Sequence, residues 1–167
     1  MVSQLARTHS TFSTNLTAGG FCDTNLNGPV QFQGSQPIQV AHFANGHDFD
    51  SFSGILYGDP CEVLLLPTGH YLTTNIVVTL PNDNFIGDFN TNYVSLIVAQ
   101  AGISSTLLNG APVASTNFIA IGSSGYYGAQ IPVSNLVNAV SSSQPVGVEV
   151  YGFGYYDAYG YFGGIVK

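Results

Sequence analysis

The segment from Ser141 to Gly164 constrains the fold more than any other part of the sequence. After a turn-forming Ser/Pro stretch, a valine stands at every second position (Val146, Val148, Val150), and Glu149 lies between the last two. A period of two places the valines on one face of a β-strand and Glu149 on the other. A glycine-punctuated aromatic run follows, with Tyr155, Tyr156, Tyr159, Tyr161 and Phe162. Because repeated glycines and β-branched residues disfavour a helix, this pattern predicts a strand that leads into a tyrosine-rich loop.

Similar short apolar segments recur along most of the chain, with turn-forming residues between them. The predicted strands are Val30–Phe32, Ile38–His42, Glu62–Leu66, Asn75–Leu80, Tyr93–Val98, Thr106–Leu108, Phe118–Ile121, Ala129–Val133 and Val146–Phe153. Asn109-Gly110 between two apolar runs is typical of a two-residue β-hairpin. Residues 133–140 allow either one helical turn or a strand connection. Regularly spaced short strands predict an all-β fold, an antiparallel β-sandwich of jelly-roll-like type.

Length and charge limit the organisation and the partners. The 167 residues favour one domain, with residues 1–20 as a Ser/Thr-rich lead-in arm or stalk end and 21–167 as the β-sandwich. Only 7% of residues are charged, the net charge is −7, and the only Arg and Lys are Arg7 and Lys167. Nucleic acid and anionic membrane surfaces are therefore poor partners. Apolar runs are too short for membrane insertion, and no signal peptide is visible after Met1.

The two cysteines, Cys22 and Cys61, lie in turn-rich contexts. Their spacing fits neither a zinc site nor a redox pair. Two interpretations remain, a disulfide that closes a loop of roughly 40 residues and contributes about 3–4 kcal/mol, or two buried thiols. The neutral surface, rich in hydroxyl and amide groups, is commoner in extracellular sandwiches, and this favours the disulfide.

Tyrosine-rich segments supply the candidate ligand-binding residues, which are Tyr126, Tyr127, Tyr155, Tyr156, Asp157, Tyr159 and Tyr161. Tyrosine offers a large contact area and a hydroxyl at low entropic cost, and is therefore favoured at recognition surfaces. Flanking glycines suggest loop tips for the pairs at 126–127 and 155–156. The alternative hypothesis is that Tyr151, Tyr159 and Tyr161 are core or corner residues that hold the last strand.

Two acidic loops contain the side chains that a metal would need. One holds His42, His47, Asp48 and Asp50, and the other holds Asp83 and Asp88. Asp-x-Asp spacing with a nearby His suits Ca²⁺ or Zn²⁺, but no twelve-residue calcium loop is present. Solvated loop residues are the simpler interpretation, and we predict neither a metal nor a cofactor.

The sequence contains no strong catalytic motif. A glycosidase needs two carboxylates across a cleft, whereas the only glutamates are Glu62 and the mid-strand Glu149. No G-x-S-x-G elbow marks a nucleophilic serine. The segment Gly58–Cys61 is similar to the self-cleaving G-D-P-H motif of mucin-type proteins, with Cys61 in place of the histidine. We predict that the chain is not an enzyme, and cleavage at Asp59-Pro60 is the alternative.

Four blocks of the sequence resemble the IgGFc-binding domain of IgG Fc-binding proteins and their bacterial relatives. The blocks are Gln36–Val40, Gly58–Pro67, Leu108–Gly110, and Pro145–Phe153 continued by Asp157–Gly164. They occur in order between residues 35 and 164, and the last one is the most specific.

The sequence departs from the family pattern at Phe162, Asn109 and Ala158, where the family has proline, aspartate and serine. The N-terminal portion of the family domain is missing or replaced by residues 1–34. The resemblance implies an extracellular, β-rich adhesion or recognition module without catalytic residues. We therefore expect a cell-surface or extracellular domain that binds a glycan or protein through its Tyr/Asn-rich loops. The alternative is a structural tip or homotrimerisation domain of a surface fibre, with no ligand of its own.

Overall fold

The computed structural model describes residues 13–26, 28–46, 58–73, 75–81 and 89–164. Its regular structure is almost entirely β, and every strand pair is antiparallel. Short 3₁₀-helices occupy connections at Thr68–His70 (η1), Gln100–Ser105 (η2) and Ser115–Asn117 (η3). In this part of the chain no helix is both long and apolar enough to cross a membrane. The predicted all-β fold is confirmed.

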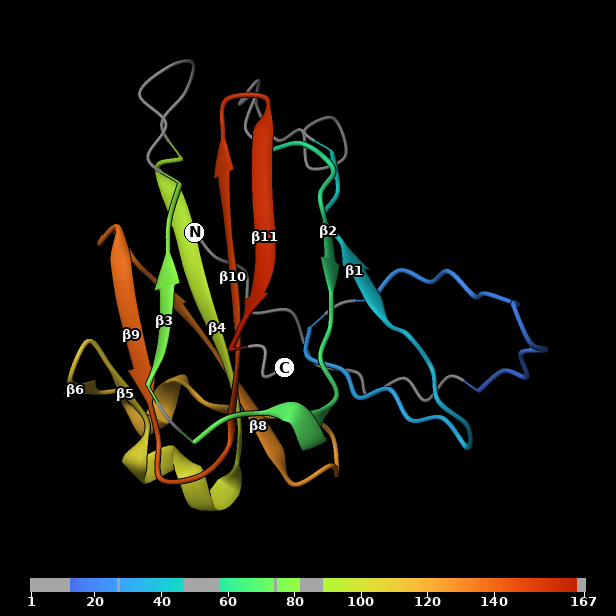
Figure 1. Cartoon of the computed structure of the whole chain (residues 1–167), viewed down its shortest axis with the longest axis horizontal. Coiled ribbons are helices and arrows are strands. Elements are labelled where there is room, and N and C mark those ends of the chain that lie inside the picture. The colour runs from blue at the N-terminus through green and yellow to red at the C-terminus, as the bar shows by residue number, and fades with distance from the viewer. Residues whose placement is uncertain (1–12, 27, 47–57, 74, 82–88, 165–167) are drawn as a thin grey trace.

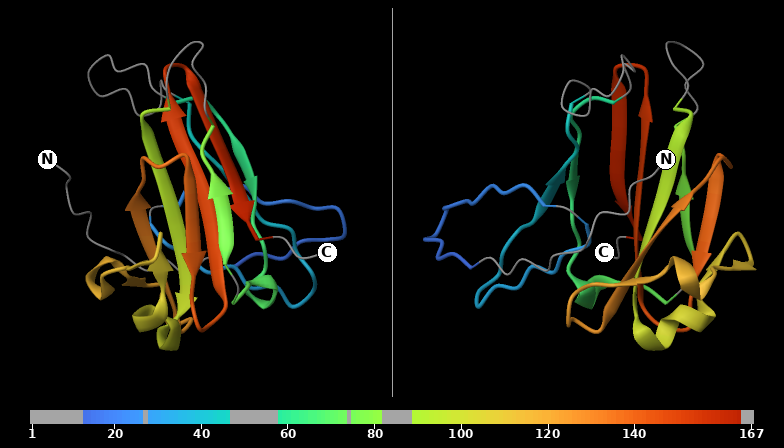
Figure 2. Two further views of the ribbon diagram at one scale, coloured as in Figure 1. Left: turned by 60° about the vertical axis from the view of Figure 1, so that its left-hand side comes forward. Right: turned by 180° about the vertical axis from the view of Figure 1, so that it is seen from behind.

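Two sheets form a sandwich, and a third, smaller sheet covers part of its outside (Figure 1 and Figure 2). The five-stranded sheet has the order β11 (Asp157–Gly163), β10 (Val146–Gly154), β4 (Thr91–Ala99), β8 (Tyr126–Pro132) and β7 (Ile119–Ala120). The four-stranded sheet has the order β3 (Ile76–Thr79), β9 (Val137–Ser141), β5 (Leu107–Leu108) and β6 (Ala111–Pro112). The third sheet pairs β1 (Ala41–Phe43) with β2 (Glu62–Leu64), and β2 packs against β11. The predicted antiparallel sandwich is therefore present, with an added layer.

The core lies between the two larger sheets and follows the alternation seen in the sequence. Every second residue of β4 is buried, and the valines of β10 face the same way. The fully buried apolar side chains are Val78, Val94, Leu96, Val98, Val140, Val146, Val148 and Val150. In β10, Gly147 and Glu149 are buried as well, because further side chains cover the outer face of this strand.

The predicted Asn109-Gly110 hairpin joins β5 to β6. Both residues have positive φ, 53° and 77°, as a type I′ turn requires. The Asn109 side chain also ties the turn to β9, because its Oδ1 accepts from the Ala139 N–H at 2.9 Å. Residues 133–136 contain no helical turn and lead directly into β9, so the strand connection predicted as one alternative is the correct one.

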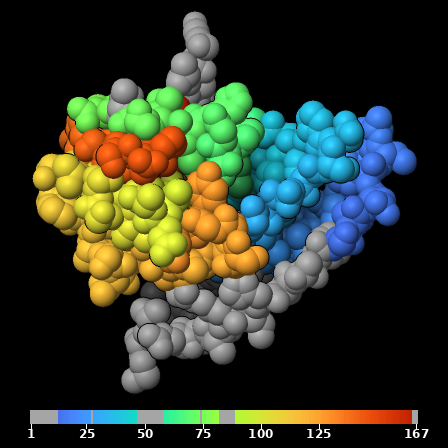
Figure 3. All heavy atoms as spheres, turned by 90° about the horizontal axis from the view of Figure 1, so that it is seen from below, coloured from blue at the N-terminus to red at the C-terminus, as the bar shows by residue number. Residues whose placement is uncertain are grey.

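The region before β1 contains no strand within the described residues. Val30–Phe32 was predicted as a strand and is not one, and of the next predicted segment, Ile38–His42, only Ala41 and His42 lie in a strand, β1. Alternation alone specified a strand here, but none of the strands in the described part of the chain pairs with this segment. The segment from residue 13 to residue 40, the arm, projects from one side of the sandwich (Figure 3). A domain division at residue 20 stays a prediction.

Candidate binding surface

The tip of the β10–β11 hairpin brings together three of the predicted ligand-binding residues. Tyr155 and Tyr156 form the turn between the paired residues Gly154 and Asp157. Their rings meet edge to face at 4.7 Å between centroids, and they are 48% and 44% exposed. Asp157 is exposed, and its Oδ1 accepts a hydrogen bond from the Ala158 N–H at 2.8 Å. Two amphipathic rings and one carboxylate therefore face solvent at the end of a rigid hairpin.

Tyr156 has an unusual backbone conformation. Its φ is +50°, in the left-handed region that a bulky side chain rarely adopts. Such strain costs about 1–3 kcal/mol and is concentrated at functional sites. The turn therefore holds a tyrosine where glycine or asparagine would be less strained.

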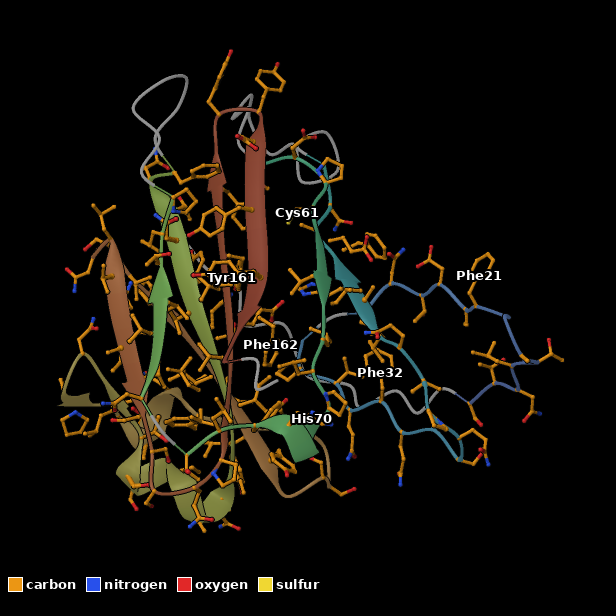
Figure 4. The ribbon with its side chains drawn as sticks, viewed as in Figure 1. Phe21, Phe32, Cys61, His70, Tyr161 and Phe162 are labelled. Atoms are coloured by element: carbon orange, nitrogen blue, oxygen red, sulfur yellow. The ribbon has the colours of Figure 1, made fainter. Side chains whose placement is uncertain are left out.

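Tyr159 and Tyr161 have a different role, because they lie on the face of β11 that points toward the second sheet. The Tyr161 hydroxyl donates to the Thr79 carbonyl at 2.6 Å and accepts from the Thr79 N–H at 2.8 Å (Figure 4). The Tyr159 hydroxyl donates to Asn92 Oδ1 at 2.8 Å, and burial raises the pKa of Tyr159. Both rings pack against the core, as the alternative hypothesis of bracing residues describes.

Tyr126 and Tyr127 are not at a loop tip, as the flanking glycines suggested, but at the start of β8. Pairing of β8 with β4 places successive side chains on opposite faces of the sheet. Tyr127 packs against the core. Tyr126 faces outward and meets Tyr71 edge to face, with the centroids 6.5 Å apart. Both rings are half-buried, so each offers only part of its surface to a ligand.

Cys22 and Cys61 are both free thiols in this structure, which does not contain the predicted disulfide. Cys22 is exposed on the arm, while Cys61 is half-buried immediately before β2. Burial raises the pKa of the Cys61 thiol. The two thiols are separated because the arm leaves the sandwich, a path that the spacing of the cysteines did not reveal.

The candidate metal loops lie largely outside the described residues, since these do not include His47, Asp48, Asp50, Asp83 or Asp88. Among the residues that are described, no group of three or more His, Cys, Asp and Glu side chains could hold a metal ion. The remaining member of the first loop, His42, lies on β1 and turns toward the five-stranded sheet.

His42 forms an ion pair with Glu149 between the third layer and the sandwich. His42 Nδ1 lies 3.0 Å from Glu149 Oε1, although 107 positions separate the two residues. The Glu149 side chain is only 11% exposed, whereas that of His42 is 57% exposed. The hydrogen bond to Glu149 raises the pKa of His42, burial opposes this rise, and the charge of Glu149 adds to it. The mid-strand glutamate therefore anchors β1.

On the outer face of the five-stranded sheet, aromatic rings lie on either side of Glu149. Tyr93 and Tyr151 are direct cross-strand partners, and their rings stack at 5.5 Å between centroids. On the other side, the Tyr71 ring lies over Gly147 and stacks on Phe162 at 5.9 Å. Burial, together with Tyr126 and Glu149, raises the pKa of Tyr71 to about 12.

The sequence analysis did not single out Tyr93 or Tyr71 as site residues. The alternation Tyr93-x-Ser95 on β4 and Glu149-x-Tyr151 on β10 was a usable indication, because it places these side chains on the face opposite the valines. Their proximity across strands, however, depends on register, and a single sequence does not fix the register.

Comparison with known proteins identifies the family. The sequence model of the IgGFc binding protein family matches residues 3–152. Neither curated proteins nor solved structures gave a match to the chain. The family match includes residues 3–34, which the sequence analysis had left outside the resemblance, and it ends within β10, before the hairpin tip. Because the match covers most of its length, this chain belongs to the IgGFc binding protein family.

Proposed function

We propose that this domain is an extracellular adhesion or recognition module that contacts a cell-surface glycan or protein with the tip of its β10–β11 hairpin. The family is one of binding proteins by its description, which supports a binding role for this chain. The low content of charged residues is common in extracellular domains, and it fits a surface that interacts through hydroxyl, amide and aromatic groups.

The observation that carries this proposal is the pair of exposed tyrosine rings at the tip. Tyr155 and Tyr156 support each other edge to face, so little side-chain entropy is lost when a ligand binds. Exposed rings with a strained backbone at the end of a hairpin contribute little to the core, and a role in recognition accounts for both features.

A binding assay with tip variants tests the proposal. We expect Tyr155→Ala and Tyr156→Ala to lower binding to a glycan array or to cells by about tenfold or more, because exposed aromatic anchors dominate such interfaces. The matched control is Val77→Ala, which removes a similarly exposed apolar side chain, 61% exposed, from β3. Equal binding by the tip variants and the parent chain would exclude the tip as the contact surface.

The exposed arm favours a second candidate function, a structural tip or homotrimerisation domain of a surface fibre. Its large apolar side chains are exposed, and the most exposed of them, Phe21, has 88% of its surface in solvent (Figure 4). The exposed apolar side chains of the arm are Leu16, Phe21, Leu26, Val30, Phe32 and Ile38. Ordering a chain without burying it is unfavourable, so assembly with other copies would supply the missing contacts.

Light scattering at high protein concentration distinguishes this candidate. Assembly through the arm predicts a trimer that dissociates in the double variant Phe21→Ser/Phe32→Ser, while the tip variants stay trimeric. A monomer at all concentrations would remove the support for a structural role.

A further inference from the structure

Within the described part of the chain, the β1–β2 pair covers only part of the outer face of the five-stranded sheet. The β1–β2 pair lies against β11, and Val63 of β2 occupies the space above Gly160. Farther across the sheet, Tyr93 and Ser95 of β4 are half-buried and Gln130 of β8 is exposed. These side chains belong to adjoining cross-strand rows, so they lie next to one another on one face.

The side chains of this face are held in place before any ligand arrives. Tyr93 and Tyr151 stack with an interplanar angle of 28°. The Gln130 amide donates to the Tyr151 hydroxyl. Burial raises the pKa of Tyr151, so its phenol stays protonated over the physiological range. The result is a pair of stacked tyrosine rings bordered by an amide and a hydroxyl.

Glu149 lies in the neighbouring row, directly opposite Ser95. Its carboxylate is nearly buried and paired with His42, so the exposed group of this pair is the imidazole of His42. Among the residues that the structure describes, none is a Lys or Arg, so none of them offers a full positive charge to an acidic ligand at this face. The net charge of −7 also opposes the approach of anions.

We propose that this face, formed by Tyr93, Tyr151, Gln130 and Ser95 beside the Glu149–His42 pair, is a second binding site that takes a neutral oligosaccharide. The apolar face of a pyranose ring packs on the exposed part of the tyrosine rings, as other rings do. Sugar hydroxyls bond to the Gln130 amide and the Ser95 hydroxyl, which together supply both donors and acceptors. Sialylated or sulfated sugars bind less well because they carry the same sign of charge as the chain.

This inference deepens the proposed recognition role and rests on it, but it places the sugar on a surface other than the hairpin tip. The test is isothermal titration calorimetry of the full chain with neutral di- to tetrasaccharides of hexoses and N-acetylhexosamines, and with their sialylated counterparts. The variants are Gln130→Ala, Tyr93→Ala and the tip double variant Tyr155→Ala/Tyr156→Ala, each checked by circular dichroism.

We expect Tyr93→Ala to weaken the binding of a neutral oligosaccharide by about tenfold and Gln130→Ala by about fivefold. Sialylated versions should bind more weakly to the parent chain. Gln130 is exposed, so its variant keeps the test valid even if Tyr93→Ala unfolds the sheet. Absence of binding to every neutral oligosaccharide, or unchanged affinity in Gln130→Ala, would overturn the inference.

The tip variant separates this inference from the proposed function. If it loses binding to cells while neutral oligosaccharides still bind the face, both stand. If binding to oligosaccharides depends on Tyr155 and Tyr156 and not on Gln130, the face is excluded and the tip is supported.

Discussion

Tyrosines occur both at the base and at the tip of the β10–β11 hairpin, but their roles in the two places are opposite. At the tip, Tyr155 and Tyr156 are 48% and 44% exposed, and their rings meet edge to face. At the base, Tyr159 and Tyr161 point between the sheets, and their hydroxyls bond to Asn92 and Thr79. All four residues lie within seven positions of the sequence. The difference shows that the role of a tyrosine here is set by strand register and by the presence of a second sheet, and not by local composition.

The tyrosines at the base of the hairpin can pack closely because a glycine of β10 lies beside them. A Cβ atom at Gly152 would lie 2.5 Å from Cε1 of Tyr159 and 2.3 Å from Oδ1 of Asn92. The space that glycine leaves on β10 is therefore occupied by the tyrosine ring of β11. The glycine at position 152 of the sequence therefore reflects close packing at the base of the hairpin.

Substitution of Gly152 should have the largest effect. Gly152→Ala places a methyl group against the Tyr159 ring, Asn92 and the Thr91 carbonyl, and we expect a loss of about 3 kcal/mol in the free energy of unfolding. Urea denaturation measures this loss. The control is Gly69→Ala, because an added Cβ there meets no atom within 4 Å. Equal stability of the two variants would show that the base is loosely packed.

Removal of one hydroxyl from the base should have a smaller effect. Tyr161→Phe leaves the N–H and the carbonyl of Thr79 without their shared partner, so we expect a loss of about 1–2 kcal/mol. The same change at the tip, Tyr155→Phe, should leave the unfolding free energy nearly unchanged. If both substitutions lower the free energy of unfolding by the same amount, the hydroxyls at the base contribute no more to stability than those at the tip.

The division into base and tip was only partly predictable from the sequence. Alternation in Val146–Val150 predicted the strand and its buried face, and Asn109-Gly110 predicted the type I′ hairpin, because both depend on neighbouring residues alone. The tyrosines were grouped as one candidate surface, with bracing as an alternative for some of them. The structure separates them because β11 turns one face toward β3, and this is a contact between distant parts of the chain.

Long-range contacts also account for what the sequence analysis missed. His42 was assigned to a candidate metal loop and Glu149 was noted as a mid-strand glutamate, yet the two side chains form an ion pair. No local pattern links positions so far apart. The prediction of a strand at Val30–Phe32 was wrong for the converse reason. The local alternation is typical of a strand, but no strand among the described residues pairs with this segment.

Relief of the strained turn should give a still smaller effect, of opposite sign. Asparagine tolerates positive φ better than tyrosine does, so Tyr156→Asn should be more stable than Tyr155→Asn by about 1 kcal/mol. Each variant loses the same edge-to-face ring pair, so their difference reports the backbone of residue 156 together with the other interactions of the Tyr156 side chain. Thermal unfolding of both variants measures it. A lower stability of Tyr156→Asn would mean that the tyrosine ring itself holds the turn.

The smallest effect concerns the base and depends on pH. The ion pair with Glu149 raises the pKa of His42 above its ordinary value of 6.5. A raised pKa in the folded state means that the protonated form stabilises the fold, so the contribution is full below pH 6.5 and is lost as pH rises through the folded pKa. Since more than half of the His42 side chain is exposed, solvent screening limits this contribution to less than about 1 kcal/mol.

Thermal unfolding of the parent chain and of His42→Gln between about pH 5 and pH 9 isolates this contribution. The stability difference between the two proteins should be largest at the acidic end and should shrink as His42 loses its proton. Glutamine keeps a donor near Glu149, so the part of the difference that varies with pH reports the charge and not the hydrogen bond. The tip variant Tyr155→Ala should show the same pH dependence as the parent chain, because the tip is remote from this pair. A difference that grows with rising pH would mean that Glu149 stabilises the fold through a partner other than the imidazolium of His42.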